Sequence, residues 1–279
     1  MNFADHLKHF GIIHFSDGSY WDWGGELLGP RRGKQLEKLR KPLQRGKPKK
    51  VDLFAFYEFI STPEVASVVH SMKADAIRAT GEFVATHASG PRILDVGCNI
   101  GYLTTWYGLS RPADQILGID LSPSSINAAK RHADKLGIKN VEFRAVDANQ
   151  FAPTEKYDCV IDTQGFIDNP SASTVVERCL SWLNPGGRLV CVPAIGTEEQ
   201  FGEFISNLEA AGGAVPFCNW VRFTDVGEPG AYPALVIARK EDANGLSQAD
   251  LMEIFNQMMA DFAERYREAQ EALLELAGS

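Results

Sequence analysis

Three aspartates could act together on a ligand, because each one closes a short apolar run of the same kind. Asp95, Asp120 and Asp147 end or follow runs of apolar, partly β-branched residues that are typical of strands buried in a parallel sheet. The carboxyl ends of such strands meet at one edge of the sheet, where open α/β proteins bind ligands. A single aspartate at this place is commonly a helix cap or a turn residue. Three in register predict a row of carboxylates at one edge of the sheet, where they could accept hydrogen bonds from the hydroxyl groups of a ligand.

A glycine loop follows the first of these aspartates. Gly97 and Gly101 bracket a short turn between the apolar run and the next segment. Glycine adopts positive φ angles and lets a ligand approach the main chain, while the N–H groups of a following helix would point at the same place. Asn99 lies in the middle of the loop, and asparagine tolerates left-handed backbone angles better than most residues. The loop is therefore predicted to form one wall of a cofactor site.

The pattern Asp95-x-Gly97-x-Asn99-x-Gly101 resembles the first motif of class I S-adenosylmethionine-dependent methyltransferases. The usual form of that motif is acidic-x-Gly-x-Gly-x-Gly, and Asn99 stands in place of the middle glycine. The dinucleotide-binding pattern Gly-x-Gly-x-x-Gly fits less well, because its third glycine is missing here. A second segment, residues 183–189 (Leu-Asn-Pro-Gly-Gly-Arg-Leu), closely matches the turn before the fifth strand of the same family. The resemblance covers about residues 60 to 240.

This resemblance implies a fold and a cofactor. The fold is α/β, with a Rossmann-like seven-stranded, mostly parallel sheet, helices on both faces and an antiparallel last strand. The cofactor is S-adenosyl-L-methionine, with Asp120 accepting the ribose hydroxyls and Asp147 accepting from the adenine amino group. The cofactor-binding candidates are Asp95, Gly97, Asn99, Gly101, Tyr102, Asp120, Leu121, Asp147, Ala148 and Asp162. Dehydrogenases place an acid at a similar point, so a dehydrogenase-like or non-catalytic nucleotide-binding protein stays an alternative.

Methyl transfer is an in-line displacement at a sulfonium, so positioning the acceptor against the methyl group can supply much of the rate. A general base is needed only when the acceptor is a poor nucleophile. The candidate bases are His14, Asp17, Asp162 and Asp168, and the candidate substrate contacts are Tyr20, Trp21, Trp23, Tyr57, Gln164 and Phe166. Many of them lie in an aromatic and acidic loop, residues 14–25, or after a predicted fourth strand. Aromatic residues that only pin an extension to the core are the alternative interpretation of that loop.

The rest of the chain supplies the elements that must hold these residues. Strands are predicted at residues 92–96, 115–120, 141–147, 157–162 and 188–193, with a final pair at 219–224 and 234–239. One helix is predicted from a Thr62 cap to the stop at Gly90, with His70 on its surface, and another begins at Ser122. A long helix over residues 247–276 has apolar residues near the 3.6-residue helical period.

Three regions are predicted along the chain. Residues 1–60 form an N-terminal cap or lid with a basic arm, residues 61–240 the methyltransferase domain, and residues 241–279 a helical extension. The cap shows no clean apolar period and is expected to be irregular with short helices. The C-terminal helix is expected to pack on the body or on a second copy in a homodimer. A membrane role is not expected, because acids dominate its polar face.

Composition limits the partners. At 279 residues and 44% hydrophobic content the chain can bury a full core, and no apolar run approaches the roughly 18 to 20 residues of a membrane helix. Five scattered cysteines suit a reduced interior, so the protein is expected to be cytoplasmic and to hold no metal site.

Charge is distributed unevenly along the sequence. Residues 31–50 contain ten Lys or Arg and one acid, a charge of +9 in a chain whose net charge is −8. This basic arm, residues 31–50, is either a solvated surface or a contact for an anion or for RNA. A small-molecule acceptor, methylated on oxygen, nitrogen or carbon as in secondary metabolism, is favoured by the acidic remainder of the chain. RNA is the second candidate because of the basic arm.

Overall fold

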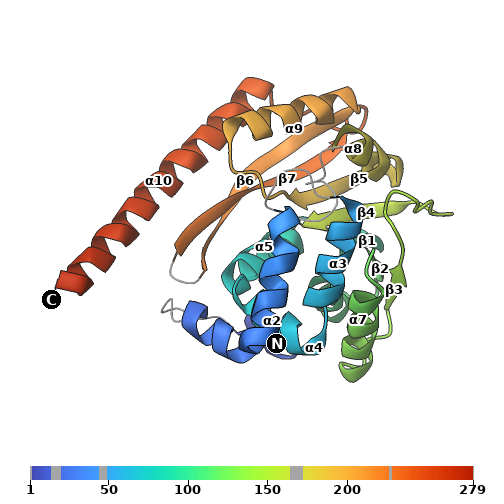
Figure 1. The fold of residues 1–279 in the computed structure, drawn as a ribbon. Coiled ribbons are helices and arrows are strands. Elements are labelled where there is room, and N and C mark those ends of the chain that lie inside the picture. Colours follow the sequence, from blue (N-terminus) through green and yellow to red (C-terminus); the bar gives the residue numbers. More distant parts are fainter. Residues whose placement is uncertain (1, 14–19, 44–48, 164–171, 226–227, 279) are drawn as a thin grey trace.

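The computed structural model describes residues 2–13, 20–43, 49–163, 172–225 and 228–278. Helices and strands alternate along most of the chain (Figure 1). In order they are α1 (Phe3–Lys8), α2 (Tyr20–Leu43), α3 (Lys50–Ile60), α4 (Pro63–Ser71), α5 (Ala74–His87), β1 (Arg92–Val96), α6 (Tyr102–Ser110), β2 (Gln115–Asp120), α7 (Pro123–Lys135), β3 (Val141–Ala145), β4 (Tyr157–Thr163), α8 (Ala172–Ser181), β5 (Leu183–Val192), α9 (Glu198–Ala210), β6 (Gly213–Asp225), β7 (Glu228–Arg239) and α10 (Gln248–Gly278).

The described strands form one seven-stranded sheet in the order β3-β2-β1-β4-β5-β7-β6. Strands β1 to β5 pair with one another in parallel, whereas β7 is antiparallel to both β5 and β6. The last strand of the chain is thus inserted between β5 and the edge strand. The predicted fold class is confirmed, including the antiparallel last strand.

Helices cover both faces of the sheet (Figure 1). The side chains of successive residues in a strand point to opposite faces of the sheet, as the first two buried residues of β1 show. Ile93 packs in a cluster with α1, α5, α6 and α7, while Leu94 packs in a second cluster with α8, α9 and α10. Because both faces are buried, the strands read as nearly continuous apolar runs, which is why the sequence revealed them.

The single helix predicted from Thr62 to Gly90 is wrong, because the chain forms two helices there. Lys73 leaves helical geometry at φ −121° and ψ 24°, and α5 begins directly after it. The carboxylate of Asp225, at the end of β6, accepts a hydrogen bond from the backbone N–H of Asp75 at 2.9 Å. This cap comes from 150 residues further along the chain, so the continuous apolar pattern of the segment could not reveal the break.

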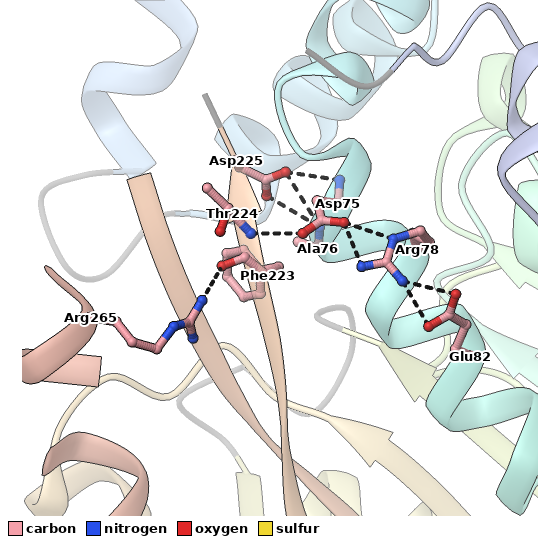
Figure 2. A network of polar contacts seen from close by, with 8 residues as sticks. All are labelled: Asp75, Ala76, Arg78, Glu82, Phe223, Thr224, Asp225 and Arg265. Atoms are coloured by element: carbon pink, nitrogen blue, oxygen red, sulfur yellow. Dashed lines mark hydrogen bonds and ion pairs between the residues drawn. The ribbon is translucent and has the colours of Figure 1, made fainter. Parts of the chain in front are cut away.

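The cap between β6 and α5 is reciprocal (Figure 2). The backbone N–H of Thr224 donates to the Asp75 carboxylate at 2.7 Å, while Asp225 accepts from α5 as described. Arg78 donates to Asp75 at 2.7 Å and to Glu82 at 2.8 Å, which holds the Asp75 carboxylate in place. The end of the β6–β7 hairpin is therefore attached to the start of α5 from both sides.

Helix α10 packs back onto the body of its own chain with its first turns. Leu251, Phe255 and Met258 are buried in the same cluster as α9, and Phe255 stacks on Phe201 with ring centroids 4.5 Å apart. Further along, the guanidinium of Arg265 donates to the Phe223 carbonyl of β6 at 3.2 Å (Figure 2). The homodimer stays a prediction. Among the described helices, none combines the length and apolar character required to cross a membrane.

The N-terminal region is more helical than predicted. The segment expected to be a loop at residues 14–25 is helical from Tyr20 onward, and α2 continues to Leu43. Gly29, at φ 69° and ψ 163°, interrupts this helix, and Pro30 follows it. Proline is favoured at the first position of a helix, so the second segment of α2 begins there. Most of the described basic arm is thus a helix rather than an extended tail.

Candidate cofactor site

The glycine loop between β1 and α6 has the backbone geometry that its sequence predicts. Gly97 and Gly101 have φ angles of 71° and 84°, and Asn99 has φ 50°. A Cβ atom on Gly101 would lie 2.8 Å from Ala129 Cβ and 2.9 Å from Phe143 Cζ. Glycine is therefore required at residue 101 by both backbone angle and space.

Asn99 keeps the turn, which gives a physical reason for its presence where the family has glycine. Its side-chain Oδ1 accepts a hydrogen bond from the N–H of Ile100 at 2.7 Å. Its own N–H donates to Asp120 Oδ2 at 2.9 Å. A local side-chain bond of this kind is how asparagine offsets the cost of left-handed angles. The loop is thus fastened both to itself and to the end of β2.

Asp120 is the centre of this arrangement. Its Oδ2 accepts from Asn99, and its Oδ1 accepts from the N–H of Ser122 at 2.8 Å. Burial raises the pKa of Asp120, and these two N–H donors act against that rise. The backbone N–H groups of Gly97 and Cys98 also donate to β2, at the Ile119 carbonyl. A carboxylate is consequently held at the end of β2 beside the glycine loop, as predicted.

Asp95 is buried, and its side chain points to the same face of the sheet as that of Asp120. Only 1% of its surface is exposed, and Thr104 of α6 donates to its Oδ2 at 2.6 Å. Burial raises the pKa of Asp95 to about 7, with the charge of Asp120 adding to the rise and the Thr104 bond opposing it. Cys98 is packed beside these acids, and burial raises the pKa of its thiol well above the usual value. A thiol of that kind is a packing group, not a nucleophile.

The structure separates Asp162 from the row of carboxylates. Asp162 is 1% exposed and pairs in register with Val96 of β1, so its side chain points to the face covered by α8, opposite to Asp95. Asp147 lies two residues beyond the end of β3, where its Oδ1 accepts from the N–H of Asn149 at 2.9 Å. The N–H of Val146 donates to the Asp120 carbonyl at 2.9 Å, so Asp147 and Ala148 lie close to the end of β2.

A carboxylate that sequence reasoning missed, Glu58 of α3, joins the site from the N-terminal region. It accepts from the hydroxyl of Ser122, from the N–H of Ser124 at 3.1 Å and from the Ser124 hydroxyl at 2.7 Å. These donors lie at the start of α7, where a helix favours a negative charge. Ser61 and Ser125 add a hydroxyl contact at 2.5 Å. Helix α3 is thereby attached immediately beside Asp120, whose pKa the Glu58 charge also raises.

Two histidines support the glycine loop from within. His70 was expected on a helix surface, which is wrong: it is 7% exposed and its ring lies 5.5 Å from that of Tyr102. His6 of α1 is fully buried, with Nε2 2.9 Å from the Tyr102 carbonyl and 3.1 Å from Thr105 Oγ1. Burial lowers the pKa of both imidazoles to about 4. Both are therefore neutral near pH 7.

The remaining candidates divide into two groups. Tyr57 of α3 is half-buried near Tyr102, and Leu121 is half-buried after β2. Tyr20, Trp21 and Trp23 lie in the first turns of α2, where the backbone alone is described. His14, Asp17, Gln164, Phe166 and Asp168 lie outside the described residues. Their proposed roles as base or substrate contact stay predictions.

A family model described as a methyltransferase domain matches residues 87–257, which include the whole sheet and the first turns of α10. The chain belongs to this methyltransferase family. Over 101 residues it is 35% identical to a ubiquinone biosynthesis O-methyltransferase of Bradyrhizobium diazoefficiens, covering 36% of this chain and 39% of that protein. Over 103 residues it is 28% identical to the protein of that name from Acinetobacter baylyi, covering 36% and 42%.

These matches leave much of each protein unaligned, since the chain spans 39% to 42% of the length of these two relatives. Among solved structures, a chain of the complex between the Haloferax volcanii Trm112 methyltransferase activator and a methyltransferase aligns with TM-score 0.55 at 15% identity, over 66% of this chain and 97% of that one. Mitomycin 7-O-methyltransferase aligns with TM-score 0.54 at 15% identity, over 76% and 69%. At such identities the likeness shows the fold alone. The methyltransferase family predicted from the glycine loop is confirmed.

Proposed function

We propose that this chain transfers a methyl group from S-adenosyl-L-methionine to an oxygen of a small-molecule acceptor. The observation that carries the proposal is the Asp120 carboxylate, held by two backbone N–H groups beside a loop with three left-handed residues. A ribose diol needs a fixed acceptor of this kind, and a close main-chain approach needs those backbone angles. Methylation of oxygen, rather than nitrogen or carbon, is supported by the relatives named O-methyltransferase.

The described residues fit the parts of such a cofactor. Asp120 would accept the ribose hydroxyls, Asp147 would accept from the adenine amino group, and the glycine loop would contact the methionine end. When bound, the cofactor would supply an electrophilic methyl group on a sulfonium, so that a C–O bond to the acceptor could form while the C–S bond breaks and the neutral sulfide leaves with the bonding electrons. The chain's own contribution is to orient the acceptor and exclude water.

The acceptor's proton has to leave during the transfer. A phenol-type hydroxyl is acidic enough to need only a modest base, whereas an aliphatic alcohol needs a strong one. Asp162, His14, Asp17 and Asp168 remain the candidates for that role. The burial of Asp162 at the end of β4 supports it as a positioning residue more than as a proton acceptor open to the acceptor hydroxyl.

Two measurements test the cofactor and the reaction separately. In thermal unfolding, S-adenosylhomocysteine should raise the melting temperature and NAD should not, since a ligand that binds the folded state stabilises it. Stabilisation by NAD alone would support the dehydrogenase-like alternative. Radiolabelled methyl transfer is then measured into a panel of phenols, alcohols and amines and into total cellular RNA. Label in the phenols supports the proposal, and label in RNA alone would replace the small-molecule acceptor by the second candidate.

RNA stays the second candidate because of one observation, the +9 charge of the basic arm. Since most of the described arm is helical and packed on α3 and α4, deleting it would disturb the fold. Replacing the exposed Lys38 and Lys41 with glutamine is a gentler test. If RNA is the substrate, RNA binding should depend steeply on salt and should be weaker in this variant than in the wild type. Methylation of a phenol should be the same in both.

A further inference from the structure

A cavity of about 570 Å³ lies at the break in α2, between this helix and the end of α3. Its lining includes Leu28, Gly29, Arg31, Arg32 and Gln35 of α2 and Phe59 of α3. Ligand pockets in proteins commonly have volumes in the range of roughly 300 to 1,000 Å³. The cavity is therefore large enough for a small organic molecule.

Two neighbouring residues of α3 show that this cavity and the cofactor site are different places. Glu58 points to the start of α7 and contacts Ser122 and Ser124 there. Phe59 lines the cavity beside α2. Successive side chains on a helix point about 100° apart. One helix thus forms a wall of both sites, with the proposed methyl transfer on one side and the cavity on the other.

The cavity has an apolar floor. Leu28 is 7% exposed and packs in a cluster with Val65 and Val68 of α4. Phe59 is partly buried against the same cluster. Such a floor suits the hydrocarbon or aromatic body of a ligand, because burial of that surface is favourable.

The rim of the cavity is cationic. Arg31 and Arg32 are exposed, and among the residues that the structure describes neither guanidinium has an acidic partner. Gln35 lies four residues after Arg31 and three after Arg32, on the same side of the helix, and supplies an amide group. The guanidinium fork binds a phosphate or a carboxylate with two parallel hydrogen bonds, which suits these side chains better than a neutral ligand.

The break at Gly29 produces this arrangement. A continuous helix would carry Arg31 and Arg32 along a straight surface, whereas the non-helical Gly29 turns the second segment of α2 against α3. Pro30 follows the break as the first residue of that segment, and Arg31 and Arg32 come directly after it. Apolar floor, two guanidinium groups and the start of a helix are therefore brought together by one glycine.

We propose that this cavity binds a small organic anion, a phosphate or a carboxylate carried on an apolar body. Leu28 and Phe59 contact the body, and Arg31, Arg32 and Gln35 bind the anionic group. The site also gives the basic arm a specific role at its first two residues, while the cations further along the helix stay solvated.

Isothermal titration calorimetry with phenyl phosphate and benzoate tests the proposal, and inorganic phosphate serves as the probe without an apolar body. We expect one-to-one binding of at least one organic anion, more weakly for inorganic phosphate. The double variant Arg31→Gln/Arg32→Gln should lower that affinity by about tenfold or more. The matched control Lys38→Gln/Lys41→Gln removes the same charge from exposed positions of the same helix, and should change the affinity by less than about twofold.

A second variant reports on the floor of the cavity. Phe59→Leu should lower the affinity for phenyl phosphate and leave the affinity for inorganic phosphate unchanged. Unaltered thermal stabilisation by S-adenosylhomocysteine would show that each variant is folded. The proposal is overturned if none of the probes binds, or if both double variants weaken binding equally. Equal weakening, together with binding of a short RNA oligonucleotide, would identify the basic arm as a diffuse nucleic-acid surface instead.

Discussion

The glycine loop and helix α3 meet at Asp120, but they are held there by different kinds of interaction. The loop is held by its own backbone, through positive φ angles and N–H groups directed at the end of β2. Helix α3 is held by side chains, through Glu58 and the serines of α7. The first arrangement is local and depends on a few residues in one segment. The second depends on pairs of residues more than 60 positions apart in the sequence.

The largest effect is expected where both arrangements meet. Asp120→Asn should weaken binding of S-adenosylhomocysteine by about tenfold to a hundredfold, because it removes a charged acceptor for ribose hydroxyls. Asp134→Asn, at an exposed position of α7, is the control and should bind normally. Equilibrium binding is measured after confirming that both variants unfold cooperatively. Unchanged affinity in Asp120→Asn would mean that the ribose is bound elsewhere.

The next effect concerns pH and the histidine beside the loop. His70 has its pKa lowered to about 4 by burial, while an unfolded histidine takes up a proton near pH 6.5. The folded state therefore has its full stability above about pH 6.5 and loses it as the pH falls towards 4. Between pH 7 and pH 5 the wild type should lose about 2 kcal/mol more than His70→Gln.

Urea unfolding at several pH values, for wild type and variant, checks this difference. Asp95 works in the opposite direction, since its raised pKa of about 7 makes the folded state less stable as the pH rises through that value. Comparing wild type with variant at each pH cancels this contribution. His9→Gln, at an exposed position, should follow the wild type. Parallel curves for wild type and His70→Gln would contradict a buried, neutral His70.

A smaller effect is expected from the side chains that attach α3. Glu58→Gln removes the charge that Ser122 and Ser124 stabilise, and should lower the free energy of unfolding by about 1 to 2 kcal/mol. Combining it with Ser124→Ala should cost less than the sum of the two single changes. Glu203→Gln, exposed on α9, serves as the neutral comparison. Additive effects would show that the two side chains are not coupled, and that α3 is held by packing instead.

The smallest effect is expected outside the cofactor site, at the reciprocal cap between β6 and α5. It measures how much one side-chain attachment contributes to the free energy of unfolding in this fold. Burial raises the pKa of Asp225 to about 6, so its charge near pH 7 partly offsets its hydrogen bonds to α5. Asp225→Ala should lower the free energy of unfolding by about 1 kcal/mol, as loss of a helix cap does. Asp225→Asn keeps an acceptor without the charge and should change it by less than about 0.5 kcal/mol. Thermal unfolding of the two variants decides, and a larger loss for Asn would contradict a cap weakened by burial of charge.

The difference between local contacts and contacts between distant residues also decides what could be predicted from the sequence. Strands buried on both faces appear as apolar runs, and Asn99 of the glycine loop and its partner Asp120 are 21 residues apart, within one strand–helix–strand unit. The break between α4 and α5, the buried His70 and the Glu58 contacts could not be predicted, because each depends on a partner in another element. Asp162 shows the limit within the sheet itself. Its position at a strand end was predictable, but the face to which it points depends on register between strands.

The buried contact of His6 affects how the protein is made. His6 of α1 and Thr105 of α6 are 99 residues apart. At roughly 5 to 20 residues per second, synthesis leaves α1 without its partner for about 5 to 20 seconds. During that interval Phe3, Leu7 and Phe10 form an apolar surface on the nascent chain that chaperones and proteases can reach. The apolar side of a helix that is translated first is therefore covered only after α6, about a hundred residues later, has been made.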